Sequence, residues 1–582
     1  MSLERNSKLI NRKFIMYLVP SILMIFAMQF GSLVDGILVG NFIGNDALSA
    51  SSLVLPILYI VQIPGFAIGV GGAIVVANLL GKRDIVGAKK AFSFSMIVGM
   101  SISIVFALIS FFASRPLAAL FGEASLEYSY PYVYMYLLTD PIITFALLIG
   151  SFMAVDNNPR LSSIFYIISN IAKVGLEVLF IKVFNMGMYG AALSTGAGYL
   201  VGCIAVIFYF INKKRMLTLT FKIKGCGGKN VFKASATTTL NLLLTAIQML
   251  VANIFIGKLL SSYDLVLYGL ISNMVFLFDL LCGGILNIIP NLCGIFYGEK
   301  DYYSLKSVAR KIYWLTLIVT VLISLFILIF PNAYCAIFGY TETGDPTYLN
   351  MILWVYLISF LPYEINKFST NYYPTIDKNV PSILTVILRE SVIVLPLTLV
   401  LLHTHGLLGY CIASAVNEVA TVIIVYIFLI FYNKKKNYKG IYMVEKLDYE
   451  SFDVSLDNEM KNASAVSEQI IEFAKNHNIP NRESQIVGLA CEEMVDNIVE
   501  YGYKKERHNY IDVNLKVIDD TLLLRIRDDG VPFDPTKYEF DENENYSTSG
   551  IKLIMGLTDK ISYMRVLNLN NTVFEIKFNK GA

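Results

Sequence analysis

A succession of long apolar runs constrains the fold of this chain more than any other feature of its sequence. From the N-terminus to about Phe431 there are about twelve runs, centred near residues 25, 65, 102, 142, 172, 200, 246, 282, 320, 362, 391 and 419. A helix needs about 20 apolar residues to cross the hydrocarbon core of a bilayer. The residues are 55% hydrophobic and only 16% charged, so we predict an all-α polytopic membrane bundle.

The two halves of the apolar region look like copies of each other. The sequence GKRD begins at Gly81 and GEKD begins at Gly298, each between apolar runs and 298 − 81 = 217 residues apart. The dipeptide FG at residues 121 and 338 has the same offset. Two matches at one offset indicate an internal duplication. We therefore predict two six-helix repeats, residues 1–215 and 216–432, of a kind found around the central site of transporters.

The basic residues of the loops predict the orientation in the membrane. Most of them follow the even-numbered runs, whereas the other loops contain mainly Arg115, Lys182 and Lys258. By the positive-inside rule, both termini and the C-terminal domain are cytoplasmic in an inner or plasma membrane. The basic start and first run resemble a signal peptide, but the run continues toward Gly40 without a small-residue cleavage site. We interpret it as an uncleaved first span.

Ionisable residues inside the apolar runs are the candidates for an ion or substrate pathway. A charge at the bilayer centre costs at least about 2.5–3.5 kcal/mol, so such residues need a reason to be there. Lys173 and Glu177 are four residues apart and share a helix face, so they form either a structural ion pair or part of a site. No sequence neighbour could neutralise Asp35, which favours a functional role. The full candidate set is Asp35, Lys173, Glu177, Asp279 and Glu364, whereas Arg389, Glu390 and Glu418 are interpreted as snorkelling or structurally paired.

Two motifs in the first repeat carry a family resemblance. The sequence VDGILVGN from Val34 and the sequence LEVLFI from Leu176, followed by NMG and GAA, resemble the multidrug and toxic compound extrusion (MATE) family. The resemblance covers about residues 10–435. It implies a V-shaped pair of lobes, an outward–inward switch, and export of a small cationic or amphipathic solute coupled to H⁺ or Na⁺.

The resemblance also assigns roles in the first repeat. The family's cation site uses an Asp on span one and an Asn and an Asp four apart on span five. Asp35 matches the first of these, Glu177 stands at the second carboxylate, and Lys173 replaces the Asn. A tethered ammonium could occupy the place of the coupling cation. Our hypothesis is that Na⁺ binding is weakened or lost and that protonation of Glu177 or Asp35 drives the cycle; the coupling ion stays open at this point.

The chain changes character at Asn433. Residues 433–452 form a basic linker, and residues 453–582 have an ordinary soluble composition and enough length for a core of their own. Apolar periodicity predicts an α/β sandwich with a mixed sheet. The expected strands are 451–456, 510–517, 522–527, 561–565 and 572–578, and the expected helices are 463–475, 484–501 and 550–557.

Polar residues in this domain form a nucleotide-binding pattern. Glu493 and Asn497 lie one helical turn apart, which suits a general base beside an Mg²⁺-binding amide. Asp528 and Gly530 follow a predicted strand, where a carboxylate can accept from an adenine amino group. Gly550 begins a predicted helix, whose free N–H groups can bind phosphate.

These residues resemble the Bergerat-fold ATPases, and more closely the anti-sigma factor serine kinases. The sequence CEEMVDNIVEYGY from Cys491 is similar to that family's first box. The resemblance implies Mg-ATP as cofactor, Glu493 as catalytic base, Asn497 as Mg²⁺ ligand, and Asp528 as adenine contact. The run STSG ending at Gly550 stands where a glycine-rich loop is usual, so ATP binding is expected and serine kinase activity stays open.

The leading interpretation is a secondary exporter with an ATP-binding regulatory domain. One alternative is a membrane-anchored switch serine kinase or anti-sigma-like regulator whose transporter-like half is a sensor. Another is a flippase for lipid-linked precursors. The expected partners are the lipid bilayer, a small-molecule substrate and, for a kinase, a protein phosphoacceptor, with no nucleic acid. The seven cysteines are scattered without a C-x-x-C pair, which predicts free thiols and no zinc site.

Overall fold

The computed structural model describes most of the chain. It covers residues 4–120, 122, 125–211, 215–222, 224–225, 227–338, 346–438, 440–443, 445, 449–503, 509–537 and 547–579, without the side chains of residues 253, 257, 258, 262 and 547–549. Part of the second repeat match, Phe121 and Gly339, lies outside these residues. The chain forms two compact units: Met16–Lys436, and Asn437–Ala582 together with the N-terminal residues up to Ile15.

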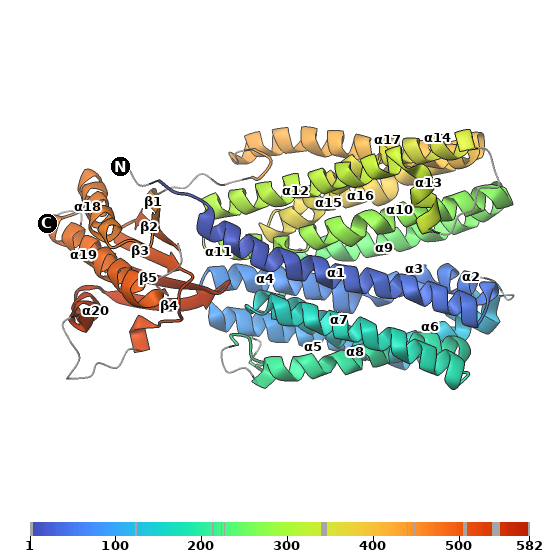
Figure 1. Ribbon diagram of the computed structural model, residues 1–582, viewed down its shortest axis with the longest axis horizontal. Coiled ribbons are helices and arrows are strands. Elements are labelled where there is room, and N and C mark those ends of the chain that lie inside the picture. The colour runs from blue at the N-terminus through green and yellow to red at the C-terminus, as the bar shows by residue number, and fades with distance from the viewer. Residues whose placement is uncertain are drawn as a thin grey trace. The chain divides into compact units, whose positions relative to one another are not determined.

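The first repeat is a bundle of helices that are long and apolar enough to cross a membrane (Figure 1). Several spans contain short breaks or π-turns, so one span can comprise two or three elements. The elements are α1 (Lys8–Phe42), α2 (Asn45–Leu53), α3 (Leu55–Val61), η1 (Ile63–Ala67), α4 (Ile68–Gly81), α5 (Ile85–Ala119), α6 (Leu126–Val155), α7 (Pro159–Val178), η3 (Leu179–Val183) and α8 (Gly187–Ile211).

The second repeat has the same plan and forms the other group of helices in Figure 1, coloured green to orange. Its elements are α9 (Gly228–Leu259), α10 (Ser262–Leu286), α11 (Ile289–Gly298), α12 (Tyr302–Ile329), α13 (Pro331–Ile337), α14 (Pro346–Leu357), α15 (Phe360–Thr375), α16 (Asn379–Ile387), η4 (Leu388–Val392) and α17 (Val394–Lys436).

The number of spans agrees with the sequence. Eleven helical segments among the described residues are long and apolar enough to cross a membrane, and the last, Asn379–Lys436, has 58 residues. This segment breaks at Gly406, where φ is 57° and ψ is −140°. After the break the chain returns beside its earlier part, because Arg389 Nε lies 2.8 Å from Glu418 Oε1. The segment therefore makes two crossings, and the predicted bundle of about twelve helices in two repeats is confirmed.

The duplication is visible in the backbone as well as in the sequence. The carboxylate of Asp84 caps α5 by accepting from Gly87 N (2.7 Å), and the carboxylate of Asp301 caps α12 by accepting from Ser304 N (3.1 Å). The residues before the caps also match, since Arg83 has φ 63° and Lys300 has φ 53°. The sequence offset of 217 therefore corresponds to the same turn built twice.

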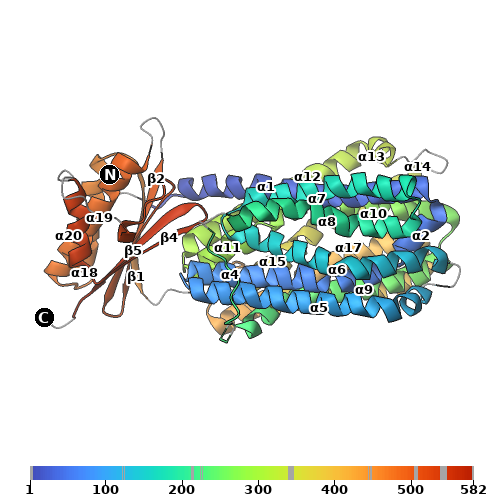
Figure 2. The ribbon, with the colours of Figure 1, turned by 90° about the horizontal axis from the view of Figure 1, so that it is seen from below.

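The repeats meet where α4 and α11 pack side by side (Figures 1 and 2). A Cβ at Gly81 would lie 2.9 Å from the Cα of Gly298, and a Cβ at Gly298 would lie 3.0 Å from the Cα of Gly81. These distances are shorter than a carbon–carbon contact allows. The two equivalent glycines therefore let the backbones of the two repeats touch.

The unit with the C-terminal domain contains a five-stranded sheet of order β1-β2-β3-β5-β4. All four strand pairings are antiparallel, so the prediction of a mixed sheet was wrong. The β2–β3 and β4–β5 connections are tight turns at residues 519–520 and 567–568, which join antiparallel strands. The β1–β2 and β3–β4 connections are longer and contain the helices. The elements are β1 (Glu450–Asp457), α18 (Lys461–Asn476), α19 (Asn481–Asn497), η5 (Ile498–Gly502), β2 (Tyr510–Ile518), β3 (Thr521–Asp528), η6 (Pro535–Lys537), α20 (Ser547–Leu557), β4 (Lys560–Val566) and β5 (Leu569–Lys577).

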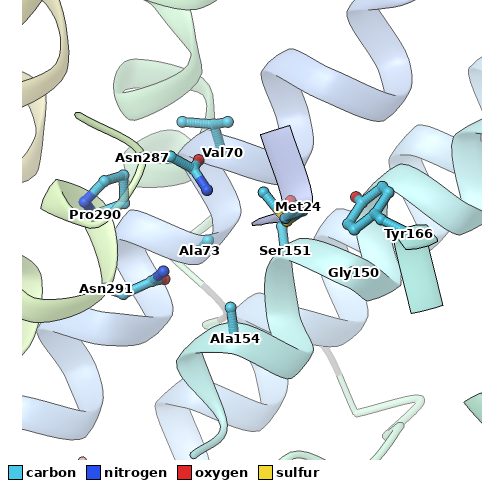
Figure 3. Close-up of a pocket in the computed structure, with 10 residues that line it drawn as sticks. All are labelled: Met24, Val70, Ala73, Gly150, Ser151, Ala154, Tyr166, Asn287, Pro290 and Asn291. Atoms are coloured by element: carbon cyan, nitrogen blue, oxygen red, sulfur yellow. The ribbon is translucent and has the colours of Figure 1, made fainter. Parts of the chain in front are cut away.

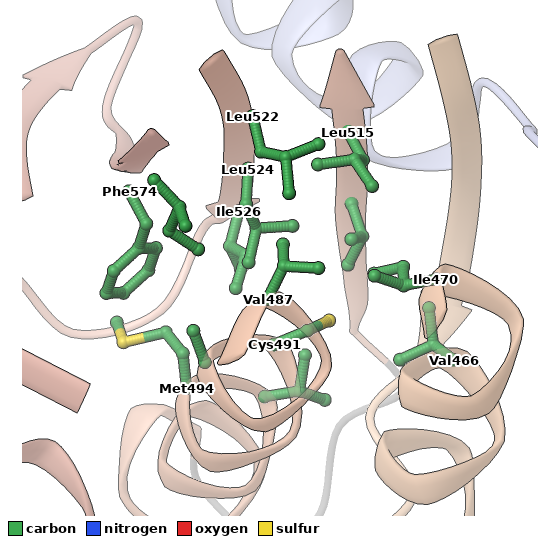
Figure 4. Close-up of a cluster of buried hydrophobic side chains, with 14 of the residues drawn as sticks. Val466, Ile470, Val487, Cys491, Met494, Leu515, Leu522, Leu524, Ile526 and Phe574 are labelled. Atoms are coloured by element: carbon green, nitrogen blue, oxygen red, sulfur yellow. The ribbon is translucent and has the colours of Figure 1, made fainter. Parts of the chain in front are cut away.

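One apolar core lies between this sheet and its helices. Alternating strand residues face α18 and α19, because successive side chains of a strand point to opposite faces. The labelled side chains in Figure 4 show this layer: Val466 and Ile470 from α18, Val487, Cys491 and Met494 from α19, Leu515 from β2, Leu522, Leu524 and Ile526 from β3, and Phe574 from β5.

Candidate functional site

The first-repeat candidates lie together on α1 and α7. The ammonium of Lys173 forms an ion pair with Asp35 Oδ2. The two helices can approach because Gly31 faces the Asn170 side chain, and Ser163 Oγ donates to Pro20 O (2.6 Å). Lys173 is therefore engaged with the neighbouring helix, rather than in an ion pair with the residue one turn along its own helix.

Glu177 completes this group but has a different environment. Its side chain is fully buried, and neither carboxylate oxygen has a hydrogen-bond partner among the described residues. Asp35 and Lys173 both lie close enough to act on it electrostatically. The single cation of the group is already paired with Asp35. The site therefore holds two carboxylates and one ammonium, which leaves one proton or one cation to be accommodated.

A third buried carboxylate, Asp140, lies in the same repeat and was missed by sequence reasoning. It occupies the middle of α6 and is 1% exposed. One oxygen accepts from Thr144 Oγ1 (3.4 Å), and the other has no partner among the described residues. Tyr136, one turn earlier, lies close enough to act on both Asp140 and Asp35. A lone Asp inside the apolar run centred near residue 142 was the signal that could have identified it.

The second-repeat candidates lie on α10 and α15. The ammonium of Lys367 forms an ion pair with Asp279 Oδ1, and Tyr363 OH donates to the same oxygen (3.3 Å). Glu364 is 1% exposed, and neither of its oxygens has a hydrogen-bond partner in the described part of the chain. Both Lys367 and Arg389 lie close enough to act on it electrostatically. The structure thus places two cations near this buried carboxylate.

A connected set of charges surrounds Arg389 in the second repeat. Arg389 Nε contacts Glu418 Oε1 (2.8 Å), and its Nη1 contacts Glu390 Oε1 (3.2 Å). Asn366 Nδ2 donates to the second Glu418 oxygen (2.7 Å). The guanidinium also lies 4.4 Å from the ring centre of Tyr363. This arrangement agrees with the structural interpretation of these residues, since one guanidinium contacts both carboxylates within the bundle.

A small cavity of about 40 Å³ lies between the two repeats (Figure 3). It is bordered by Met24 of α1, by Ser151 of α6 and Tyr166 of α7, and by Asn287 and Asn291 from the second repeat. The polar groups at this border are amides and hydroxyls. None of the residues lining the cavity is basic.

The predicted adenine carboxylate, Asp528, lies at the end of β3 and is 2% exposed. Its Oδ1 accepts from Gly530 N (2.8 Å) and from Asn570 Nδ2 (2.8 Å). Burial raises the pKa of Asp528 to about 6, although these two hydrogen bonds oppose the shift. Gly530 itself packs on the carbonyl of Gly502, which a Cβ would approach to 2.5 Å. The carboxylate is thus held in position and mainly ionised at neutral pH.

The other predicted nucleotide residues meet at the C-terminal end of α19. Asn497 Nδ2 donates to Glu493 O (2.6 Å), which leaves the amide oxygen as the atom that could bind a cation. The backbone of Gly550 in α20 packs directly against the Glu493 carboxylate, where a Cβ would collide. The structure therefore brings Glu493, Asn497 and Gly550 together on one side of the core.

Three residues that support Asp528 were not predicted. Asn570 also donates to Val531 O (2.9 Å), and its own oxygen accepts from Arg565 Nη1 (2.6 Å) and Tyr563 OH (2.8 Å). These residues lie on β4 and β5, 35 to 42 residues after Asp528 in the sequence. No local motif marks them, because they meet Asp528 only through strand pairing.

Comparisons with known proteins divide the chain in the same way. The MatE family model matches residues 20–179 and 238–400, one segment in each repeat. The model described as histidine kinase-like ATPase domain matches residues 456–575.

Similar curated proteins and solved structures cover the membrane part. The multidrug export protein MepA of Staphylococcus saprophyticus is 25% identical over 421 residues, 69% of this chain and 91% of that protein. MepA of Staphylococcus aureus (strain MRSA252) is 23% identical, with 68% and 90% covered. A MOP superfamily transporter from Pyrococcus furiosus has a TM-score of 0.67 at 17% identity, covering 73% of this chain and 96% of that one. A Vibrio cholerae MATE transporter has a TM-score of 0.66 at 18% identity, with 73% and 97% covered.

Proposed function

This chain belongs to the MatE family and carries a histidine kinase-like ATPase domain, and from that premise we propose a proton-driven exporter that is regulated by nucleotide. The proposed substrates are small cationic or amphipathic compounds. The named relatives are multidrug export proteins, which supports export as the direction of transport.

The arrangement of Lys173 is the observation that supports protons over Na⁺. Its ammonium pairs with Asp35 and so takes a place beside the two carboxylates that a bound cation would need. Glu177 is buried, and no described residue donates a hydrogen bond to it. An ionised carboxylate in such a place is costly, so the acid form is the stable one in this arrangement. Protonated Glu177 with the Asp35–Lys173 pair gives a site of zero net charge.

Release of that proton would change the site from neutral to a charge of −1. A site of that charge attracts a cationic substrate, whereas the neutral site does not. Proton and cation then exclude each other at Glu177. Alternating access of such a site to the two sides of the membrane exchanges external protons for internal cations, which is antiport.

The test is dye export from proteoliposomes under a pH gradient or a Na⁺ gradient. We expect the pH gradient alone to drive export of a cationic dye. Lys173→Asn, which removes the tethered ammonium, should make export respond to Na⁺. Asp377→Asn, at an exposed ion pair with Lys233, is the matched control. Strong Na⁺-driven export by the parent protein, unchanged in Lys173→Asn, would exclude the proposal.

For the C-terminal domain we propose Mg-ATP binding. Support comes from the buried Asp528, held by Gly530 N and Asn570, and from the meeting of Glu493, Asn497 and Gly550. Mg²⁺ prefers oxygen donors and usually takes one or two from protein beside phosphate oxygens. The amide oxygen of Asn497 fits this requirement, and the nearby Glu493 carboxylate is proposed as the catalytic base. Bound Mg²⁺ would neutralise phosphate charge, while Asp528 would accept from the adenine.

Calorimetric titration of Mg-ATP into the full-length protein in nanodiscs tests this proposal. Asn497→Ala should weaken binding strongly, and Glu493→Ala should retain it if Glu493 is a base rather than a ligand. Affinity should fall as the pH drops through about 6, because Asp528 then becomes protonated and loses its strength as an acceptor. Equal affinity at pH 7.5 and pH 5 would argue against an adenine contact at Asp528.

The remaining alternatives predict different results in the same preparations. A switch kinase with a sensor half would transfer phosphate to a protein and would not move dye. A lipid-linked precursor flippase would move a polyanionic lipid and would not export a cationic dye. The similarity to multidrug export proteins favours the exporter.

A further inference from the structure

The N-terminal segment, residues Glu4 to Lys13, lies on the ATPase domain as part of the same compact unit. Arg5 is its first anchor. The Arg5 guanidinium contacts Asp512 (2.5 Å) on β2 and Asp453 (3.5 Å) on β1, and its side chain is only 6% exposed. Ser455 N also donates to Glu4 O (3.3 Å), so the backbone of the segment is held as well.

The second anchor is formed by Arg12 and Lys13, at the start of α1. Arg12 Nη1 contacts Asp529 Oδ2 (3.1 Å) and Asn509 Oδ1 (2.9 Å). Lys13 Nζ lies 3.7 Å from the same Asp529 oxygen and donates to Asn568 O (3.2 Å). The side chains of Lys13 and Asp529 are each 4% exposed. Buried, charge-assisted contacts of this kind are stronger than surface ion pairs.

These contacts lie next to the two segments that form the predicted adenine site. Asp529 directly follows Asp528 in the chain, and Asn568 lies in the β4–β5 turn just before Asn570. Asn570 in turn holds the Asp528 carboxylate. Lys13 thus contacts both strand ends that position Asp528. Asp528 is the last residue of β3, and its side chain lies on the same face as those of Leu524 and Ile526, which is the core face. Asp529 directly follows the strand, and its carboxylate contacts the N-terminal segment instead.

We propose that the N-terminal segment is a coupling element, whose docking on the outer face of the sheet and nucleotide binding on the core face stabilise each other. The proposal rests on nucleotide binding by this domain. Because coupling between two sites is reciprocal, a segment that strengthens nucleotide binding is itself held more firmly when nucleotide is bound.

The coupling reaches the transporter through α1. This helix begins at Lys8 within the docked segment and continues without a break to Phe42, so it also carries Asp35. It is also the least buried of the spans, with 11% of its apolar window buried against 67% for Leu126–Val155. A lightly packed helix yields to a small bias at one end more readily than a packed one. Nucleotide would thereby set how freely the helix that holds the proton site moves.

The first test compares Mg-ATP affinity in full-length protein in nanodiscs. Removing the second anchor with the double change Arg12→Gln and Lys13→Met should weaken binding about tenfold, within the range typical of coupled sites. Arg5→Met should act in the same direction. The matched control is Lys560→Met, which removes an exposed pair with Glu575 on the same sheet and should leave affinity unchanged.

The second test needs no substitution and so does not depend on a variant folding. Hydrogen exchange of residues 4–15 is measured in the wild-type protein with and without Mg-ATP. We expect slower exchange of this segment when nucleotide is bound. Wild-type protein that binds no nucleotide would overturn the proposed ATP site itself. Binding with unchanged exchange and unchanged affinity in the anchor variants would overturn the coupling alone.

Discussion

The two repeats of the membrane bundle share their turns but not their charges. The Asp84 and Asp301 caps and the touching glycines Gly81 and Gly298 occupy equivalent places. The ionisable groups described above within the spans do not. In the first repeat they lie on α1, α6 and α7 with one cation among them, and in the second on α10, α15, η4 and α17 with two cations.

This difference indicates that the two repeats have different roles. In the second repeat each cation touches a carboxylate, and Tyr363 lies beside both Lys367 and Arg389. Such a network favours one arrangement of its helices. Glu177 of the first repeat and Glu364 of the second both lack a hydrogen-bond partner among the described residues, but one cation acts on Glu177 and two act on Glu364. We infer that the first repeat performs the proton chemistry and the second holds its helices together.

The largest expected effect comes from Glu177→Gln. The amide cannot exchange a proton, so export driven by a pH gradient should fall to the level of protein-free liposomes. The matched variant Glu364→Gln, equally buried in the second repeat, should retain most export, because Lys367 and Arg389 compensate that site. Dye export under a pH gradient measures both. Equal loss in the two variants would show that the repeats share the proton chemistry.

The second prediction concerns stability and reverses the roles of the repeats. Arg389→Met removes the partner of Glu418 and Glu390 and leaves buried charges uncompensated. Breaking a buried pair in this way costs about 3–5 kcal/mol, so thermal unfolding in detergent should occur at a clearly lower temperature. Arg310→Met, at an exposed position of α12, is the control. A small shift for Arg389→Met would mean that the network contributes little to holding the helices.

The third prediction tests what the repeats have in common. Gly81→Ala and Gly298→Ala each add a methyl group within about 3 Å of the facing backbone. Overpacking of this kind costs about 1–3 kcal/mol. Because the contact is symmetric, the two variants should lower the unfolding temperature equally. Gly175→Ala, whose Cβ would meet nothing within 4 Å, should not. A large difference between Gly81→Ala and Gly298→Ala would show that the two repeats are alike in sequence but not in the energetics of this contact.

Local signals explain how much of this architecture could be predicted. Run length predicted about twelve spans, and the GKRD and GEKD motifs indicated the duplication, since each is a local pattern along the chain. The same holds for Glu493 and Asn497, one helical turn apart. The pairing of Asp35 with Lys173 joins residues 138 apart and depends on how two helices pack, so no local pattern could reveal it.

The features of the C-terminal domain that were not predicted also depend on contacts between residues far apart in the sequence. The strands were identified, but their directions in the sheet were not, because alternation along one strand does not depend on its partner's direction. Asn570 and Arg565 reach Asp528 only through pairing of β3, β4 and β5. The contact of Arg5 with Asp512 joins the N-terminal segment to the C-terminal domain, far apart in the sequence. Basic residues at a membrane N-terminus are equally well explained by orientation, which hid this role.

The smallest expected effect belongs to Asp140→Asn, and it decides whether the first repeat holds one proton site or a chain of them. The amide oxygen can still accept from Thr144, so stability should change by less than about 1 kcal/mol. If Tyr136 links Asp140 to Asp35, export should slow while a pH gradient still drives it, a milder defect than in Glu177→Gln. Initial rates of dye export measure this. An unchanged rate would leave the proton chemistry with Asp35, Lys173 and Glu177 alone, and the contrast between the repeats would then depend on these three residues.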